Sequence, residues 1–245
     1  MTRSLDVSLV TYTTSKYSDV WPMHFGQMSA HARGIKSYAF SDKESEKIWD
    51  LSDHQLVCYD ESDPYWKQYT ECLNVVESSY VIYLQEDFIL YADINIDEIR
   101  KCVDFLERSN FDYVRLIRCG YSTPLDEPAG ENLYSVKMNS SDAFSMQSTL
   151  WKKSRLQDLY THVRSQKWLE SDAWNEGARF LKIKGSFAYH GEPKIGAFHY
   201  DSKVYPYVCT AINRGKWNVD QYPEFMKDMF QKYSIDPSVR GIRKR

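Results

Sequence analysis

The sequence of 245 residues lacks a long apolar run, a marked excess of charge of either sign, and any closely spaced pair of cysteines. No apolar stretch approaches the roughly 18–20 residues that a helix needs to cross a bilayer. The first ten residues include Arg3 and Asp6 and lack the apolar region of a signal peptide. The net charge of −3 differs from the basic excess that is typical of nucleic-acid-binding proteins. These absences predict no transmembrane segment and no nucleic-acid partner.

Cysteine is scarce, and its spacing follows no known pattern. The five residues are Cys58, Cys72, Cys102, Cys119 and Cys209. Because their number is odd and no C-x-x-C pair occurs, we expect reduced thiols, and the usual zinc spacings are excluded. The cysteine pattern therefore favours a cytoplasmic protein.

The sequence does contain enough apolar residues for a large core. Hydrophobic residues make up 42% of the chain and charged residues 27%, a mixture that excludes a disordered chain. A length near 250 suits one large α/β domain or two small ones. The composition predicts a globular protein, in which the 19 tyrosines are the unusual feature.

The first 120 residues alternate strand-like and helix-like patterns. Apolar and β-branched runs predict strands over residues 5–13, 35–40, 56–59, 80–84 and 113–117. Apolar side chains at helical spacing predict helices that begin near Trp21, Pro64 and Ile96. This alternation is typical of a parallel sheet with helices on both faces. We expect an α/β fold with a mixed, mostly parallel central sheet flanked by helices.

The second half of the chain is less regular. The pattern predicts a loop over 120–132, strands over 133–137 and 143–150, helices near 156–163 and 174–181, an irregular stretch over 185–217 and a last helix over 223–232. Because neither a repeat nor a long linker occurs, we expect a single domain over residues 1–245. Its parts would be residues 1–120, residues 133–220, which would complete a site, and a C-terminal helix with a basic tail over residues 221–245.

Two adjacent acids follow the most apolar of the expected strands. The run Y-V-I-Y-L leads directly into Gln85, Glu86, Asp87 and Phe88. Ligands of open α/β sheets bind at the carboxyl ends of the strands, and carboxylates there are costly to desolvate unless they meet a cation or several donors. Carboxylate oxygens suit Mg²⁺ or Mn²⁺ shared with substrate phosphates. The alternative is that Glu86 and Asp87 begin a solvated turn.

With these elements the chain resembles a nucleotide-sugar-dependent glycosyltransferase of the GT-A fold, of the family-2-like kind. Q-E-D-F occupies the place of the acidic DXD-type motif, which would make Asp87 a metal ligand and Glu86 its neighbour at the donor. The resemblance further implies that Thr11, Tyr12 and Thr13 contact the nucleotide and that Asp42 reads the base or ribose. The departure from a strict DXD leaves open whether Mn²⁺ or Mg²⁺ is required.

The resemblance implies transfer of a sugar from a nucleotide-sugar donor, most often UDP-linked in this class, to a glycan, a lipid-linked glycan or another hydroxyl acceptor. An acid near a helix start in the second half would be the catalytic base of an inverting displacement, with Glu170 the first choice and Asp172 the second. Alternatively, Asp172 caps the helix that carries Trp174. The implied setting is polysaccharide biosynthesis.

Other residues of the second half complete the expected site. The resemblance makes His199, with His190 behind it, a candidate metal ligand, and Arg214 and Lys216 candidates for the diphosphate. Trp151 would lie in the strand that lines the acceptor cleft, and Trp217 would stack on a sugar ring. For each of these residues, the alternative is an ordinary packing or surface role.

The surplus of tyrosines fits the same cleft. Tyrosines that gather at expected strand ends and late loops are Tyr12, Tyr59, Tyr189, Tyr200, Tyr205 and Tyr207. Rings that carry a hydroxyl suit a cleft that holds a base and sugars by stacking and hydrogen bonding. We therefore expect these tyrosines at the rim of the donor and acceptor site.

The basic tail and two other functions complete the predictions. Arg240, Arg243, Lys244 and Arg245 would make a weak contact with anionic lipids or form a solvated end. A nucleotidyltransferase is the alternative enzyme, but residues 13–17 contain no glycine, whereas such enzymes usually have a glycine-rich loop there. A glycan- or nucleotide-sugar-binding domain without catalysis is the third possibility.

Overall fold

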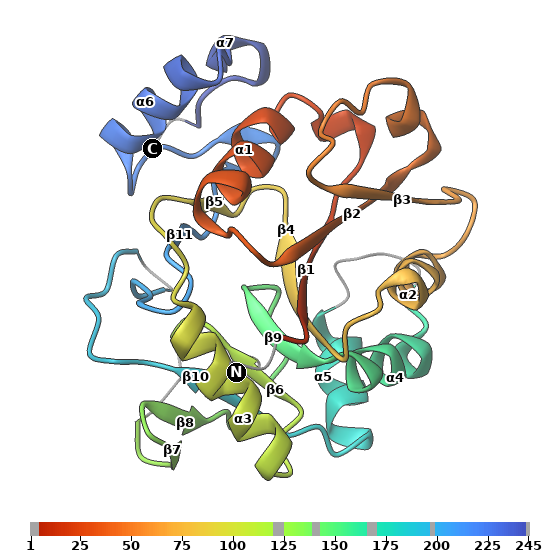
Figure 1. Cartoon of the computed structure of the whole chain (residues 1–245), viewed down its shortest axis with the longest axis vertical. Coiled ribbons are helices and arrows are strands. Elements are labelled where there is room, and N and C mark those ends of the chain that lie inside the picture. Colours follow the sequence, from red (N-terminus) through yellow and green to blue (C-terminus); the bar gives the residue numbers. More distant parts are fainter. Residues whose placement is uncertain (1–4, 120–124, 139–142, 166–170, 197–198, 244–245) are drawn as a thin grey trace.

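A computed structural model describes residues 5–119, 125–138, 143–165, 171–196 and 199–243 (Figure 1). The central sheet has nine strands in the order β3-β2-β1-β4-β9-β6-β10-β8-β7. Their bounds are β1 Val7–Tyr12, β2 Lys36–Asp42, β3 Gln55–Tyr59, β4 Tyr80–Gln85, β6 Tyr113–Arg115, β7 Pro128–Gly130, β8 Leu133–Ser135, β9 Thr149–Lys152 and β10 Gly185–Ala188.

The sheet is mixed and mostly parallel, as the sequence predicted. β1 pairs in parallel with β2 and β4, and β2 pairs in parallel with β3. β9 runs antiparallel between β4 and β6, and β8 runs antiparallel to β10. Within this sheet, β9 and β8 are therefore the strands that oppose the common direction.

The order of the strands creates a switch point between β1 and β4. The chain winds outward from β1 to β2 and β3 and then returns to β4 on the other side of β1. At the carboxyl ends of these two strands, Tyr12 lies in register with Gln85. In open α/β sheets this crevice is the usual place for a ligand.

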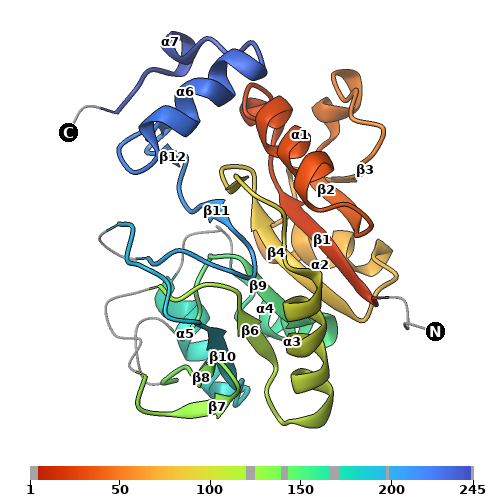
Figure 2. The ribbon, with the colours of Figure 1, turned by 60° about the vertical axis from the view of Figure 1, so that its left-hand side comes forward.

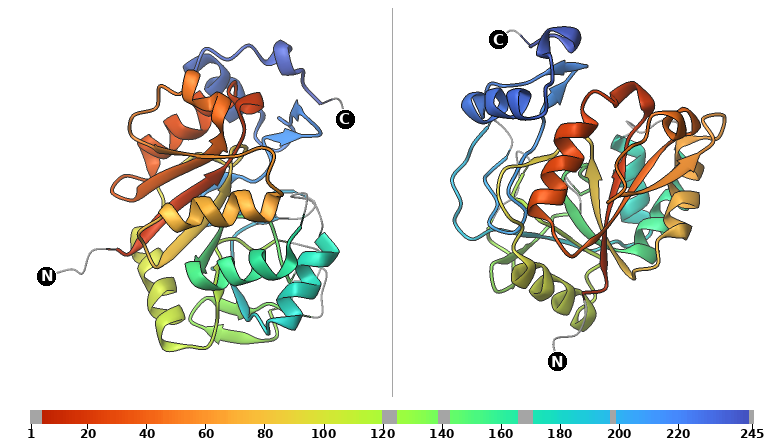
Figure 3. Two further views of the ribbon diagram at one scale, coloured as in Figure 1. Left: turned by 90° about the vertical axis from the view of Figure 1, so that its right-hand side faces the viewer. Right: turned by 45° about the horizontal axis from the view of Figure 1, so that its top comes forward.

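Helices cover both faces of the sheet (Figures 1 and 3). The α-helices are α1 Trp21–His31, α2 Tyr65–Val75, α3 Ile96–Arg108, α4 Lys153–Val163, α5 Ser171–Phe180, α6 Pro223–Lys232 and α7 Pro237–Arg240, and two 3₁₀ turns are η1 Ser15–Tyr17 and η2 Lys43–Lys47. α1 and α3 lie on one face, and α2, α4 and α5 lie on the other.

The alternation of side chains along the central strands explains the two layers. Leu9 of β1 packs with Phe25 of α1, and Val10, the next residue, packs in the opposite cluster with Tyr69 of α2. Successive side chains of a strand point to opposite faces, so a strand that is apolar throughout requires cover on both sides.

The C-terminal residues 207–243, called here the C-terminal module, pack against the start of α1 (Figures 1 and 2). The small strands of the module are β11 Tyr207–Val208, β12 Ile212–Asn213 and β13 Lys216–Trp217, and a further short strand, β5 Ile89–Leu90, follows β4. β11 pairs with β5, and β12 pairs with β13. The module thus lies beside the segment that follows β4.

The second half differs from the prediction in several elements. Of the strand predicted over 143–150, only residues 149 and 150 lie in β9, which extends to Lys152, and the predicted loop over 120–132 contains β7. The region over 185–217, predicted to be irregular, contains β10 and three two-residue strands. Strands this short show no measurable alternation, so their pairing depends on distant residues. In the described part of the chain, no helix combines the length and the apolar character that a membrane crossing requires.

Candidate functional site

Glu86 and Asp87 form a tight turn directly after β4, called here the acid turn. The backbone N–H of Phe88 donates to the carbonyl of Gln85 at 3.1 Å and closes it. Asp87 is 9% exposed, and the C-terminal module holds it: the backbone N–H of Ala211 donates to its carbonyl at 3.1 Å, and that of Ile212 to its Oδ2 at 3.3 Å. Segments far apart in sequence therefore meet at this turn.

Burial makes the two carboxylates of the acid turn difficult to ionise together. Burial raises the pKa of Asp87 to about 7, although the hydrogen bond from Ile212 opposes the rise. Burial and then the charge of Asp87 raise the pKa of Glu86 to about 8. Adjacent desolvated carboxyl groups are stabilised by a nearby cation.

A cation of the chain itself lies near the acid turn. Nε of Arg240 donates to Oδ2 of Asp19 at 2.9 Å, and its Nη2 donates to the other carboxylate oxygen of Asp19. The guanidinium lies 4.5 Å from the ring centre of Tyr17. The charge of Arg240 favours ionised Glu86, whereas that of Asp19 opposes it. Arg240 is therefore held at the site, and the predicted solvated or lipid-contacting tail is wrong for this residue.

Carboxyl groups outnumber guanidinium groups among the charged neighbours that act on Glu86. Asp19, Glu86 and Asp87 supply three carboxyl groups against the one guanidinium of Arg240, which leaves an excess of negative charge when the acids are ionised. The described residues contain no cluster of three or more His, Cys, Asp or Glu side chains that would hold a metal. Mg²⁺ sites of enzymes commonly use one or two carboxylates together with substrate phosphates.

Tyr12 is the accessible member of the predicted nucleotide-contacting group. Its ring is half-buried and stacks on Tyr59 with the ring centres 5.1 Å apart, and its hydroxyl donates to Oε1 of Gln68 at 2.6 Å. Thr11 and Thr13 are buried, and the Thr13 hydroxyl accepts a hydrogen bond from Nε1 of Trp21 at 2.9 Å. The side chains of the two threonines are therefore held inside the protein, and their contact with a nucleotide stays a prediction.

Asp42 has a structural role, which corrects the prediction that it reads the base or ribose. The side chain is fully buried, and its Oδ2 accepts from the Thr14 hydroxyl and from the Ser15 N–H, each at 2.7 Å. Its Oδ1 accepts from the N–H of Ser45 at 3.2 Å. Burial alone would raise the pKa of Asp42, but these hydrogen bonds outweigh it and lower the pKa. Both oxygens are occupied in joining the ends of β1 and β2.

The two predicted sugar-contacting tryptophans are core residues. Trp151 in β9 is 2% exposed and packs 4.4 Å from the ring centre of Tyr113. Trp217 in β13 is fully buried and lies 4.9 Å from Phe230 of α6. Neither ring offers a face to a sugar, because burying a large aromatic surface stabilises the two clusters in which they lie.

The predicted base falls partly outside the described residues. Glu170 lies outside them, and Asp172 is exposed in the first turn of α5. The roles of both residues as base therefore stay predictions.

His199 is buried. Among the described residues its Nε2 has no hydrogen-bond partner, and burial lowers the pKa of the ring. The backbone N–H of Ile195 donates to its carbonyl at 3.1 Å. His190, by contrast, has a close partner, because its Nε2 lies 3.1 Å from Oε2 of Glu98. The metal-ligating role of His199 stays a prediction, whereas His190 has a carboxylate partner.

Arg214 and Lys216 lie at the exposed tip of the β12–β13 hairpin. Arg214 and Gly215 have φ of 51° and 75°, the left-handed conformations of a tight hairpin turn. The same hairpin carries Ile212, which donates to Asp87. The two basic side chains therefore extend from an element that is fixed to the acid turn, and their contact with a diphosphate stays a prediction.

The tyrosines expected at the rim of the cleft divide into two groups. Tyr59, Tyr205 and Tyr207 are buried, whereas Tyr12, Tyr189 and Tyr200 are half-buried. The guanidinium of Arg118 lies between the last two rings, 4.8 Å from the centre of Tyr189 and 4.3 Å from that of Tyr200. The prediction that tyrosines line the rim of the cleft is therefore wrong for Tyr59, Tyr205 and Tyr207, which are buried inside the protein.

Sequence reasoning missed Tyr17, Asp19, His24 and Arg240. The first two follow β1, and the loop after the first strand of such a sheet commonly borders the ligand, a signal that was present in the sequence. Arg240 is 221 residues from Asp19, so no local pattern pairs them.

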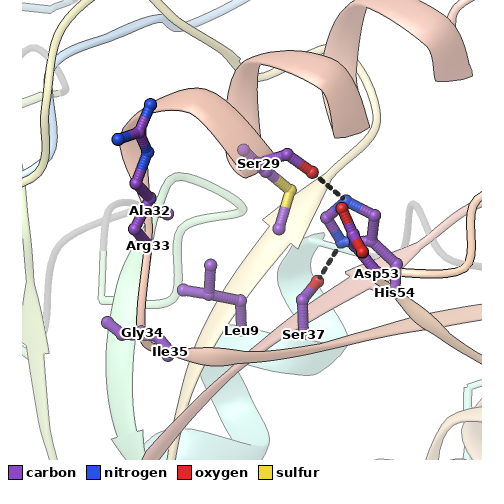
Figure 4. A pocket seen from close by; sticks show the side chains of 10 residues that line it. Leu9, Ser29, Ala32, Arg33, Gly34, Ile35, Ser37, Asp53 and His54 are labelled. Atoms are coloured by element: carbon purple, nitrogen blue, oxygen red, sulfur yellow. Dashed lines mark hydrogen bonds between the residues drawn. The ribbon is translucent and has the colours of Figure 1, made fainter.

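A cavity of about 220 Å³ lies away from the acid turn, near the amino-terminal ends of β2 and β3. Figure 4 shows His54 at its wall, with Nε2 2.9 Å from the Ser29 hydroxyl and Nδ1 2.9 Å from the Ser37 hydroxyl. Its apolar wall includes Leu9 and Met28. With no pair of adjacent acids in its lining, this cavity does not match the chemistry of the site at the switch point.

Comparison with known proteins places the fold. No protein-family model matches the sequence, and a search of curated proteins finds no match. Among solved structures, S. aureus TarS 1–349, a GT-A-like glycosyltransferase, is similar at a TM-score of 0.52 and 13% identity, over 94% of this chain and 65% of that chain. The same protein in complex with UDP gives 0.51 and 12%, over 80% and 60%.

A cytidylyltransferase from Leptospira borgpetersenii serovar Hardjo-bovis is similar at a TM-score of 0.50 and 10% identity, over 96% of this chain and 98% of that chain. The match to TarS, in contrast, spans 65% of that chain, which is less than two thirds of its length. At such identities the likeness concerns the fold alone, and the structural neighbours are transferases.

Proposed function

We propose that the protein is a glycosyltransferase that takes a sugar from a nucleotide-sugar donor at the acid turn. The observation that carries the proposal is the position of Glu86 and Asp87 at the switch point, directly after Gln85, which lies in register with Tyr12. The similarity in fold to TarS, including its complex with UDP, supports UDP as the first nucleotide to test.

The residues of the site have distinct roles in this proposal. Asp87 and Glu86 bind Mn²⁺ or Mg²⁺ together with the donor diphosphate, and the half-buried ring of Tyr12 contacts the nucleotide. When bound, the cation supplies positive charge that stabilises the departing diphosphate. Because the acidic motif departs from a strict DXD, activity has to be compared with and without the metal.

We further propose that an acceptor hydroxyl of a glycan or lipid-linked glycan attacks the anomeric carbon of the donor. Glu170, with Asp172 as second choice, accepts the proton of that hydroxyl, and the bond to the diphosphate breaks with inversion. Replacing Glu170 with Gln should abolish transfer while donor binding is retained. Turnover by that variant would contradict the assignment.

Release of UDP from a panel of UDP-sugars in the presence of Mn²⁺ tests the proposal. Asp87→Asn and Glu86→Gln should slow release by about 100-fold, the typical effect of removing a charge-stabilising group. The matched control is Glu77→Gln, because Glu77 lies just before β4 at the opposite end of the same strand and is 82% exposed. Donor binding without release would instead support a binding domain, and no binding of any donor would contradict both.

Nucleotidyl transfer is not favoured, although a cytidylyltransferase shares the fold. The segment after β1 contains no glycine before α1, so it lacks the glycine-rich loop that usually holds the triphosphate in such enzymes.

A further inference from the structure

His24 of α1 joins β1 to the acid turn. The side chain is fully buried, with its Nδ1 2.9 Å from the carbonyl oxygen of Phe88 and its Nε2 3.0 Å from the hydroxyl of Thr11. Thr11 lies near the carboxyl end of β1, and Phe88 directly follows Asp87. The imidazole thus spans the two strands that form the switch point.

The partners of His24 determine its tautomer. A carbonyl oxygen can only accept, so Nδ1 carries the hydrogen and donates to Phe88. Nε2 is then unprotonated and accepts the hydroxyl hydrogen of Thr11. The ring is neutral in this arrangement, which agrees with its burial and with a pKa that burial lowers to about 3.

These contacts restrain two successive carbonyl groups of the acid turn, those of Asp87 and Phe88. The carbonyl of Phe88 is held by His24, and the carbonyl of Asp87 is held by the N–H of Ala211. Ile212 can then donate to Oδ2 of Asp87. Loss of the bond to Phe88 would remove the restraint that α1 places on the turn, which would then be held by the bonds from the C-terminal module.

We propose that His24 is a positioning residue that fixes the Asp87 carboxylate for the metal and diphosphate, an inference that rests on the proposed function of the acid turn. Partners that orient the ligands of a metal commonly change metal affinity by about 10- to 100-fold when they are replaced.

His54 provides a matched control. It is also a buried histidine that packs against α1, with its ring nitrogens near the hydroxyls of Ser29 and Ser37, and burial lowers its pKa as well. It lies at the cavity in Figure 4, where its hydrogen bonds go to α1 and β2. Its loss should therefore disturb the same helix without releasing the turn.

The experiment compares His24→Gln, His24→Asn and His54→Gln in the full chain. Asn places an amide N–H near the position of Nδ1 and can still donate to Phe88, whereas Gln reaches only toward Thr11. The first readout is the affinity for UDP with Mn²⁺, and the second is hydrogen exchange at the amides of Ala211 and Ile212, which needs no ligand.

His24→Gln should bind UDP with Mn²⁺ at least about tenfold more weakly than His54→Gln, and the two amides should exchange about tenfold faster. His24→Asn should remain within about threefold of the wild type in both readouts. Should the Gln variant not fold, the Asn variant decides the question alone.

Equal effects in His24→Gln and His54→Gln would overturn the proposal, and so would an Asn variant as impaired as the Gln variant. If the wild type binds no UDP with Mn²⁺, the proposed function fails while the exchange readout still decides whether His24 positions Asp87.

Discussion

Replacing His24 with Gln should destabilise the protein strongly at pH 7.5 and much less at pH 5. Burial lowers the pKa of His24 from 6.5 to about 3 in the folded state. Below pH 6.5 the unfolded chain takes up a proton at this residue while the folded protein does not, so the wild type loses stability as the pH falls. The Gln side chain does not titrate, and the variant escapes this loss.

The magnitude follows from the shift. Each pH unit below 6.5 costs the wild type about 1.36 kcal/mol until the folded pKa is reached, which amounts to about 2 kcal/mol at pH 5. At pH 7.5 the variant should be less stable by about 2 kcal/mol, because the lost bond leaves the buried carbonyl oxygen of Phe88 without a donor, at a cost of about 1–3 kcal/mol. At pH 5 the two proteins should therefore be almost equally stable.

Urea unfolding at pH 7.5, 6.5 and 5.0 measures this difference. Glu86 and Asp87 also titrate with raised pKa values, and their contribution has the opposite sign, since protonation favours their buried form. It is matched most closely in His24→Asn, which can keep the bond to Phe88 and so the acid turn while removing the titrating imidazole. A gap between wild type and variant that stays constant from pH 7.5 to 5.0 would refute the account of a desolvated, neutral imidazole.

Two further substitutions test the packing around the sheet and the site. Gly185→Ala should destabilise by about 2 kcal/mol, because the added Cβ would lie 1.9 Å from a ring carbon of Tyr113 on the neighbouring strand, whereas Gly130→Ala, with its nearest contact at 3.6 Å, should be close to neutral in chemical denaturation. Arg240→Ala should lower the unfolding free energy by about 1–2 kcal/mol, since it leaves Asp19 without its paired guanidinium, and should weaken UDP binding. An unchanged denaturation midpoint in either destabilising variant would contradict the packing described.

The regular elements of the first half were predictable because their signals are local. The apolar run from Tyr80 to Leu84 is long enough to identify a buried strand, and β4 follows it closely. The helix predicted over 223–232 matches α6 at both ends. The acids after β4 could be identified as a site for the same reason, because a strand end and its next residues are adjacent in sequence.

The roles of single side chains were less predictable because distant partners decide them. Asp42 follows a strand in the expected place, yet its oxygens bond to Thr14, Ser15 and Ser45 and not to a ligand. Trp217 lies in a loop-like sequence but is buried by α6. Whether a polar or aromatic residue faces a ligand or the core depends on what the rest of the chain places over it.

Paramagnetic line broadening by Mn²⁺ in the presence of UDP tests the central claim most directly, because it locates the metal without assuming a sugar or an acceptor. The strongest loss of amide signals should occur over residues 12–17, 85–89 and 211–212, which surround the acid turn. In Asp87→Asn this loss should disappear at the same concentrations. Broadening centred elsewhere, such as the cavity beside His54, or broadening that Asp87→Asn leaves unchanged, would contradict a metal and diphosphate site at the switch point between β1 and β4.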